Sequence, residues 1–259
     1  MKKIVFLISG NIRIYEKNLS FLKDLKEIFK DYQITIASSV WDHQENIKEF
    51  KETYDIQFLD LIKEQNWDEK VSKVKFVTWE ENLAFKIPNI FHMWYSVLEN
   101  IKFLTKISNN QNLNFDYVCR FRSDIMCTGK INYLKKELEN LKENEVLFPS
   151  NRNFRGITDL FFIADYKTFL KFKNILDYID NFLQKERVFH PEYLFYSYIT
   201  ENNFKIKLAH KFELALVRYE EAKPTKTVYI PLSDRANIKI AKRKINFLKL
   251  INKIKYFFN

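Results

Sequence analysis

A short apolar strand, an amphipathic helix and a second strand follow one another within residues 3–39. The first strand is expected at about residues 3–9 and the second at Gln33–Ser39. Between them, the segment from Glu16 to Lys30 places apolar residues at helical spacing, namely Leu19, Leu22, Leu25 and Phe29. A strand, helix and strand in such close succession form a right-handed βαβ unit with parallel strands. The pattern therefore predicts an α/β fold whose sheet begins parallel.

Helical and strand patterns continue along the chain without an internal repeat or a low-complexity linker. Residues 44–72 are charged and predicted mostly helical, residues 73–79 alternate as a strand, and residues 89–107 form a long helix. Further strands are expected at 115–122, 146–149, 157–164, 204–209 and 227–230, with helices at about 130–143, 165–184 and 190–203. The order predicts one domain over residues 1–234, followed by a tail at residues 235–259.

The small number of glycines and cysteines excludes several kinds of site. The chain of 259 residues has 3 glycines, so neither a GxGxxG dinucleotide fingerprint nor a Walker A loop can be written in it. Its 2 cysteines are too few for a disulfide framework or a four-ligand zinc site, which favours a reducing compartment. The hydrophobic content of 46% is enough for one large core.

The start of the chain and its hydropathy both favour a cytoplasmic protein. The apolar run at residues 4–8 ends at Ser9, so it is read as a buried strand in preference to a signal peptide. No stretch approaches the roughly 20 apolar residues that a membrane-spanning helix needs. We therefore expect the protein to stay on the cytoplasmic side of the membrane.

The segment Tyr117–Ile125 combines a buried strand with charged residues at its end. Arg120 and Arg122 are two residues apart and share a face of the strand, where each needs an anionic partner. This arrangement suggests a diphosphate site. Asp124 lies where the strand gives way to a loop, and it could hold a divalent cation against phosphate oxygens. A structural ion pair between arginine and Asp124 explains the same residues equally well.

The order of short motifs over about residues 3–210 resembles that of bacterial surface-polysaccharide glycosyltransferases, the lipopolysaccharide and capsule enzymes with a GT-A-type nucleotide-diphospho-sugar transferase fold. The resemblance is carried by Ser9-Gly10-Asn11-Ile12-Arg13, Phe91-His92-Met93-Trp94-Tyr95-Ser96, Arg120-Phe121-Arg122-Ser123-Asp124, Asp159 before an aromatic strand, and Pro191-Glu192 at a helix start. It implies a Rossmann-like sandwich, with a central, mostly parallel sheet between helices.

The resemblance also implies a donor, an acceptor and a set of donor-binding residues. The donor would be a nucleotide-diphospho-sugar, and the acceptor a lipid-linked glycan of lipopolysaccharide, lipooligosaccharide or capsule. Its donor-binding residues would be Ser9, Gly10, Arg13, Arg120, Arg122 and Asp124. Arginine suits this role because its planar, permanently charged fork matches phosphate oxygens. Arg13 could equally be a solvated loop residue, and Arg120 a structural one.

A divalent cation, Mn²⁺ or Mg²⁺, would be held by Asp124 and by His210, which follows a late strand as a histidine does in several enzymes of GT-A type. One departure bears on this expectation. Many of these enzymes carry Asp-x-Asp, whereas here the first acidic position is Arg122. Metal dependence is therefore open at this point, and His210 could also be a surface or packing residue.

Inverting sugar transfer needs a carboxylate base near the acceptor hydroxyl. Asp159 is the first candidate and Glu192 the second. Asp159 could instead turn the chain ahead of its strand, and Glu192 stands in the first turn of a helix, where an acid is favoured by the helix dipole in any protein.

The net charge of +10 belongs mainly to the tail. Residues 235–259 hold eight of the 43 basic residues and no acidic one, so the rest of the chain is nearly neutral. Apolar residues recur there at helical spacing, which suits a basic amphipathic helix lying on the anionic inner face of the cytoplasmic membrane. A helix packed on the body fits the same pattern.

Two other classes of function are weighed against the transferase. A nucleic-acid-binding protein is suggested by the pI of about 9.3, but it would carry its basic residues across the body, so we expect no nucleic-acid partner. A membrane-docked scaffold with a degenerate, non-catalytic transferase fold is the other alternative.

Overall fold

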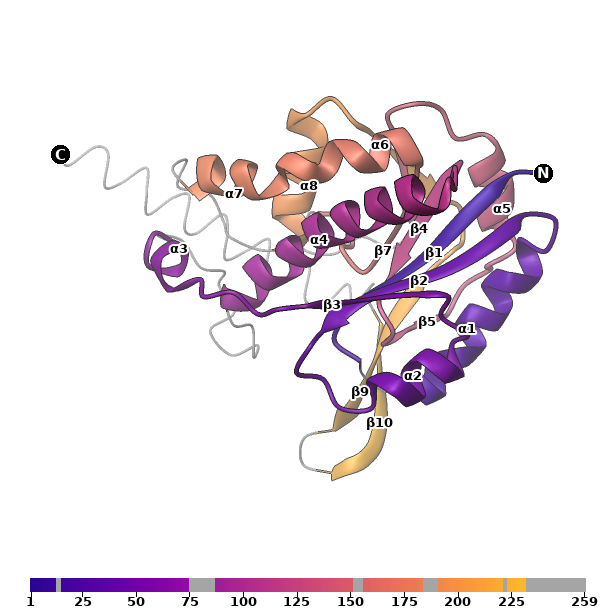
Figure 1. Ribbon diagram of the computed structural model, residues 1–259, viewed down its shortest axis with the longest axis horizontal. Coiled ribbons are helices and arrows are strands. Elements are labelled where there is room, and N and C mark those ends of the chain that lie inside the picture. Colours follow the sequence, from indigo (N-terminus) through magenta and orange to yellow (C-terminus); the bar gives the residue numbers. More distant parts are fainter. Residues whose placement is uncertain (13–14, 75–86, 151–155, 184–190, 221–222, 232–259) are drawn as a thin grey trace.

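The computed structural model describes residues 1–12, 15–74, 87–150, 156–183, 191–220 and 223–231. These residues form a seven-stranded sheet with helices on both faces and a smaller three-stranded sheet beside it (Figure 1). Arg13, most of the predicted strand at 73–79 and the basic tail at 235–259 lie outside the described residues.

The large sheet has the order β3-β2-β1-β4-β7-β6-β8. Its strands are β1 (Lys3–Gly10), β2 (Gln33–Trp41), β3 (Phe58–Ile62), β4 (Tyr117–Phe121), β6 (Glu145–Pro149), β7 (Phe161–Asp165) and β8 (Lys205–Ala209). Only β7 is antiparallel to its neighbours β4 and β6, so the other six strands run in one direction. The predicted α/β fold with a mostly parallel sheet is confirmed.

Alternating side chains of the central strands fill two separate cores. In β1, Val5 and Leu7 face one side of the sheet, and Ile4, Phe6 and Ile8 face the other. A strand with both faces covered reads as a continuous apolar run, which is why residues 4–8 carry no polar alternation.

In the part of the chain that the structure describes, one group of helices covers the first face and another group covers the second (Figure 1). The first group is α4 (Ile87–Gln111), α6 (Tyr166–Leu170), η1 (Lys171–Asn174), α7 (Ile175–Leu183) and α8 (Pro191–Glu201). The second is α1 (Tyr15–Ile28), α2 (Ile47–Thr53) and α5 (Tyr133–Glu139). The predicted long helix at 89–107 is confirmed within α4, whose buried side includes Phe91, Trp94 and Leu104.

Three strands were not expected from the sequence. β3 lies inside the segment 44–72 that was predicted mostly helical. β5 (Ile125–Cys127) and β9 (Leu214–Glu220) pair with each other in the small sheet, where β9 also pairs with β10 (Lys223–Pro231). β3 is only five residues long and pairs with β2 alone at the sheet edge. Such a strand has little local signal, because its stability comes from its neighbour.

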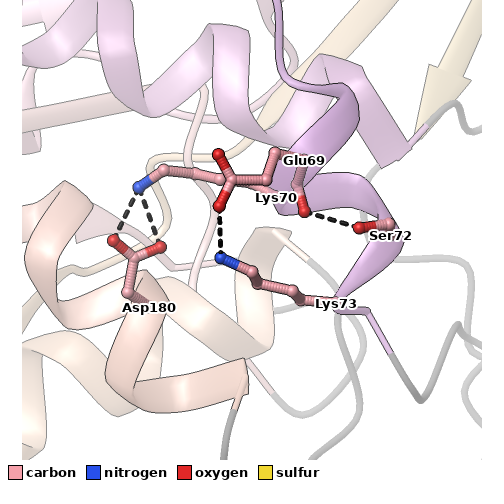
Figure 2. Close-up of polar contacts among 5 residues, drawn as sticks. All are labelled: Glu69, Lys70, Ser72, Lys73 and Asp180. Carbon is pink, nitrogen blue, oxygen red and sulfur yellow. Dashed lines mark hydrogen bonds and ion pairs between the residues drawn. The ribbon is translucent and has the colours of Figure 1, made fainter.

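The short helix α3 (Asp68–Ser72) is held against α7 by an ion pair (Figure 2). The ammonium of Lys70 lies 2.8 and 2.6 Å from the two carboxylate oxygens of Asp180. Along α3 and the residue after it, Lys73 pairs with Glu69, and the hydroxyl of Ser72 donates to the carbonyl of Glu69.

Within the described parts of the chain, no helix is both long and apolar enough to cross a membrane.

Candidate functional site

The carboxyl ends of β1 and β4 form the point where the strand order of the sheet reverses. From β1 the chain continues through α1 to β2 on one side, whereas β4 is added on the other side. In open α/β sheets, ligands bind outside the strand ends at such a switch point. Ser9 and Gly10 end β1, and Arg122 and Asp124 follow β4, so four of the predicted donor-binding residues lie at this edge.

The end of β1 offers an open main chain beside a buried hydroxyl. Gly10 has φ +95°, a conformation that residues with a Cβ rarely adopt, and a Cβ built there meets nothing within 4 Å. Ser9 is 1% exposed and faces α4, and its hydroxyl has no hydrogen-bond partner among the described residues. A ligand can therefore approach the main chain of Gly10 closely, whereas Ser9 lies beneath the surface.

The loop after β4 is tied to three other parts of the chain. The Ser123 hydroxyl donates to the carbonyl of Asn11, 3.0 Å away, which links the ends of β4 and β1. The main-chain NH of Arg122 donates to Leu160, ahead of β7, and the NH of Val217 in β9 donates to the carbonyl of Asp124. These bonds fix the position of Arg122 and Asp124 relative to the sheet edge.

Arg122 and Asp124 form a two-point ion pair at the centre of the site. Arg122 Nε lies 2.9 Å from Asp124 Oδ1, and Nη2 lies 2.6 Å from Oδ2. The side chain of Arg122 is 23% exposed and that of Asp124 only 1%. Burial lowers the pKa of the guanidinium, but the charges of Asp124 and Asp159 outweigh it, so the pKa of Arg122 is raised. The guanidinium of Arg122 therefore stays charged at any physiological pH.

Arg120 lies below the site instead of lining it, which corrects its expected contact with the donor. It is 1% exposed, its Nη1 donates to the main-chain carbonyl of Asp159, and its guanidinium carbon lies 5.8 Å from the ring centre of Phe162. Burial lowers the pKa of Arg120 to about 10, although the charge of Asp159 opposes this. Arg120 therefore attaches the segment before β7 to β4.

Asp159 and Glu192, the two candidate bases, meet beside the arginines. Burial, and then the charge of Glu192, raise the pKa of Asp159 to about 6, while Arg122 and Arg120 oppose the rise. Asp159 is 4% exposed, whereas Glu192, in the first turn of α8, is half-buried. Of the two candidate bases, Glu192 is thus the more accessible to an acceptor.

Gly156 brings these two acids together, a role that the sequence did not reveal. A Cβ on Gly156 would lie 2.1 Å from the carbonyl oxygen of Glu192, and the NH of Ile157 donates to the same oxygen at 3.3 Å. Only glycine allows this close approach of two main chains. The segment leading to Asp159 therefore packs directly on the first turn of α8.

The described side chains do not fit a divalent cation held by the protein. Among the described residues, no three histidine, cysteine or acidic side chains gather closely enough to hold a metal ion. Both carboxylate oxygens of Asp124 accept hydrogen bonds from Arg122. His210 follows β8, three strands from β4 and so about 14 Å along the sheet. Its exposed ring packs edge-on against Tyr133, so the structure does not bring His210 to Asp124.

A group of aromatic side chains lies one strand away from the open end of β1. Trp41 ends β2, next to Val40, which is the register partner of Gly10. It stacks on Tyr95 of α4 with ring centres 6.4 Å apart, and Trp67 lies 5.6 Å from the same ring. The indole NH of Trp67 donates to His92 Nδ1 at 3.1 Å. The sequence indicated the aromatic part of α4 but not its partners Trp41 and Trp67.

Neither a protein-family model nor a curated protein matches this chain. Among solved structures, it is similar to a 4-diphosphocytidyl-2C-methyl-D-erythritol synthase from Anaerococcus prevotii, with 13% identity, a TM-score of 0.42, and coverage of 95% of this chain and 96% of that one. It is also similar to the galactosyltransferase LgtC in complex with donor and acceptor sugar analogs, with 8% identity, a TM-score of 0.39, and coverage of 74% and 69%.

A further similarity is to the glycosyltransferase GlyE of Streptococcus pneumoniae, with 12% identity and a TM-score of 0.40. That match covers 80% of this chain but only 45% of GlyE. At such identities and TM-scores, the three similarities describe a distantly shared α/β arrangement of the chain and carry nothing about its substrate or reaction.

Proposed function

We propose that this protein is a glycosyltransferase that moves a sugar from a nucleotide-diphospho-sugar to a glycan acceptor. The observation that carries the proposal is the convergence of Arg122, Asp124, Asp159 and Glu192 at the carboxyl edge of β1 and β4, next to the open main chain of Gly10. Gly10, the Arg122–Asp124 pair, Asp159 and Glu192 come from four separate segments of the chain. A purely structural ion pair would need only Arg122 and Asp124.

The reaction needs positive charge where the diphosphate leaves. As the anomeric bond breaks, negative charge builds on the departing diphosphate, and preorganised donors at that point lower the barrier. Arg122 is the partly exposed guanidinium at the switch point, and Gly10 permits the phosphate groups to approach the main chain. Arg13 follows within the same motif and is proposed as a second phosphate contact.

The acceptor hydroxyl needs a base on the opposite side of the sugar. Glu192 is half-buried at the start of α8, and Asp159 is more deeply buried, with 4% exposure. We assign proton removal to Glu192, because a base must reach its substrate. We assign to Asp159 an electrostatic role, in which its charge acts on Glu192. This reverses the order in which the sequence ranked the two acids.

The aromatic group of Trp41, Trp67, His92 and Tyr95 is proposed to receive the nucleobase. It lies over the end of β2, two strand spacings from β4, which is about 10 Å and comparable to the span from a base to its second phosphate. Aromatic rings can stack with any base, and the ring of Tyr95 is half-buried within this group.

The acceptor and the place of action remain proposals that rest on the sequence. A lipid-linked surface glycan would bring its acceptor end to the inner face of the cytoplasmic membrane, where residues 235–259 are suited to bind anionic lipid. Deleting these residues is then expected to release the protein from membranes and to leave donor hydrolysis unchanged.

Donor screening with the purified full-length protein tests the proposed function. A panel of UDP-, GDP- and dTDP-sugars is incubated with the protein, and release of the nucleotide is measured with Mn²⁺, with Mg²⁺ and with a chelator. Hydrolysis of one donor, lost in E192Q, is the expected result. No binding or hydrolysis of any donor would contradict the proposal, and would favour a non-catalytic scaffold if D124A also left the cellular function intact.

A further inference from the structure

We infer that Arg122, held in place by Asp124, supplies the positive charge that a divalent cation often provides at diphosphate sites, so that the site binds a nucleoside diphosphate without a metal. The inference rests on the proposed function, because it concerns how the same site holds the diphosphate of the donor. Asp124 is then a positioning residue that acts through Arg122, and not a metal ligand.

The ion pair leaves the outer side of the guanidinium available. Asp124 binds Nε and Nη2, one hydrogen each, whereas a guanidinium has five N–H donors. In the described part of the chain, the remaining donors of Arg122 form no further side-chain hydrogen bond. Since Arg122 is 23% exposed and Asp124 is 1% exposed, the carboxylate lies behind the guanidinium. The exposed side therefore presents paired donors of the geometry that phosphate oxygens accept.

A cation at Asp124 would lie next to this arginine. Both carboxylate oxygens already accept a hydrogen bond from Arg122, at 2.9 and 2.6 Å, so a metal bound to either oxygen would come close to the guanidinium. Two positive charges within a few ångströms of each other repel, which is unfavourable in a partly buried site. The described neighbours supply no group of three ligands that could compensate for this.

Calorimetric titration of the full-length protein with UDP, GDP and dTDP tests the inference. Each nucleotide is titrated in Mn²⁺ and in EDTA, and the wild type is expected to bind one of them with Kd values equal within about threefold. R122Q is expected to weaken binding about tenfold or more in both conditions, because it removes a charged, two-point phosphate contact. K207Q is the matched control, since it also removes a partly buried cation, here paired with Glu137 at the far edge of the sheet, and should bind as the wild type does.

R122D provides the sharper test, because it introduces the Asp-x-Asp pattern beside Asp124. It is expected to bind the nucleotide only when Mn²⁺ is present. Circular dichroism shows whether this variant folds; if it does not, R122K carries the test, and its point charge is expected to recover only part of the affinity lost in R122Q.

The outcomes separate the inference from the proposed function. Wild-type binding that requires Mn²⁺ overturns the inference and leaves a metal-dependent transferase. R122Q binding as tightly as the wild type in EDTA also overturns the inference, and leaves a transferase that holds the diphosphate through residues other than Arg122. No binding of any nucleotide in either condition overturns both.

Discussion

Gly156 lies against the main chain of Glu192 so closely that a Cβ at this position would be 2.1 Å from the carbonyl oxygen of Glu192. This contact between two main chains therefore sets the distance between Asp159, before β7, and Glu192, at the start of α8. A movement of either main chain would also move its acid, so the position of the proposed base Glu192 depends on Gly156.

G156A is expected to lower both the stability and the turnover of the enzyme, since the methyl group pushes α8 away from the segment that carries Asp159. G129A is the matched control, because its Cβ would lie 2.2 Å from the carbonyl of Lys211, away from the site. Both variants should unfold at lower urea concentrations, but only G156A should lose donor hydrolysis beyond its loss of stability. Equal losses of activity in the two variants would contradict this role.

Asp159 should make the protein less stable as the pH rises from about 4 to above 6. Burial and the charge of Glu192 raise its pKa from 3.8 to about 6 in the folded state, so between these values the folded protein binds a proton that the unfolded chain has released. Its stabilising contribution is complete below the unfolded pKa and is lost as the pH passes the folded pKa. The full difference is about 3 kcal/mol.

Comparing wild type with D159N isolates this effect. Burial lowers the pKa of His92, although the charge of Glu64 opposes this. His92 therefore changes the stability with pH in the opposite direction to Asp159, because stability is lost as the pH falls below 6.5, the ordinary pKa of histidine. Urea unfolding of both proteins between pH 4 and pH 8 should give a free-energy difference that changes with pH. A constant difference would show that Asp159 is ionised like an exposed acid.

R120M should cost about 1–3 kcal/mol of unfolding free energy, because it leaves the buried carbonyl of Asp159 without its donor while keeping a side chain of similar length. Since the charge of Arg120 opposes the rise in the pKa of Asp159, the substitution should raise that pKa further. Carboxyl carbon NMR titration measures the change. An unchanged pKa would mean that Arg120 does not act on Asp159.

D124N should destabilise the protein by about 3 kcal/mol, because a buried ion pair that loses one partner leaves the other charge uncompensated. D180N removes a carboxylate that is also bound at two points, but Asp180 is 47% exposed and Lys70 is 29% exposed (Figure 2). Its cost should stay below about 1 kcal/mol. Chemical unfolding of the two variants gives the comparison, and similar costs would argue against the burial of Asp124.

The order of motifs predicted which segments meet at this edge of the sheet because these strands are parallel. Strands that run in one direction end at the same edge, so Ser9–Gly10 and Arg122–Asp124 meet wherever β1 and β4 are neighbours. The predictions differed from the structure for Arg120 and His210. The alternation of side chains along a strand predicts that Arg120 shares a face with Arg122, but it does not predict that Arg120 is fully covered. The position of His210 depends on β8, a strand at the far edge of the sheet.

The sequence by itself determined the α/β class, the parallel start of the sheet, the long helix α4 and the residues that gather at the switch point, since these follow from local periodicity and chain order. Only the tertiary structure decided which charge faces outward. Arg120 is 1% exposed and the side chain of Arg122 is 23% exposed. This difference is set by packing from distant segments, which local spacing in the sequence does not reveal.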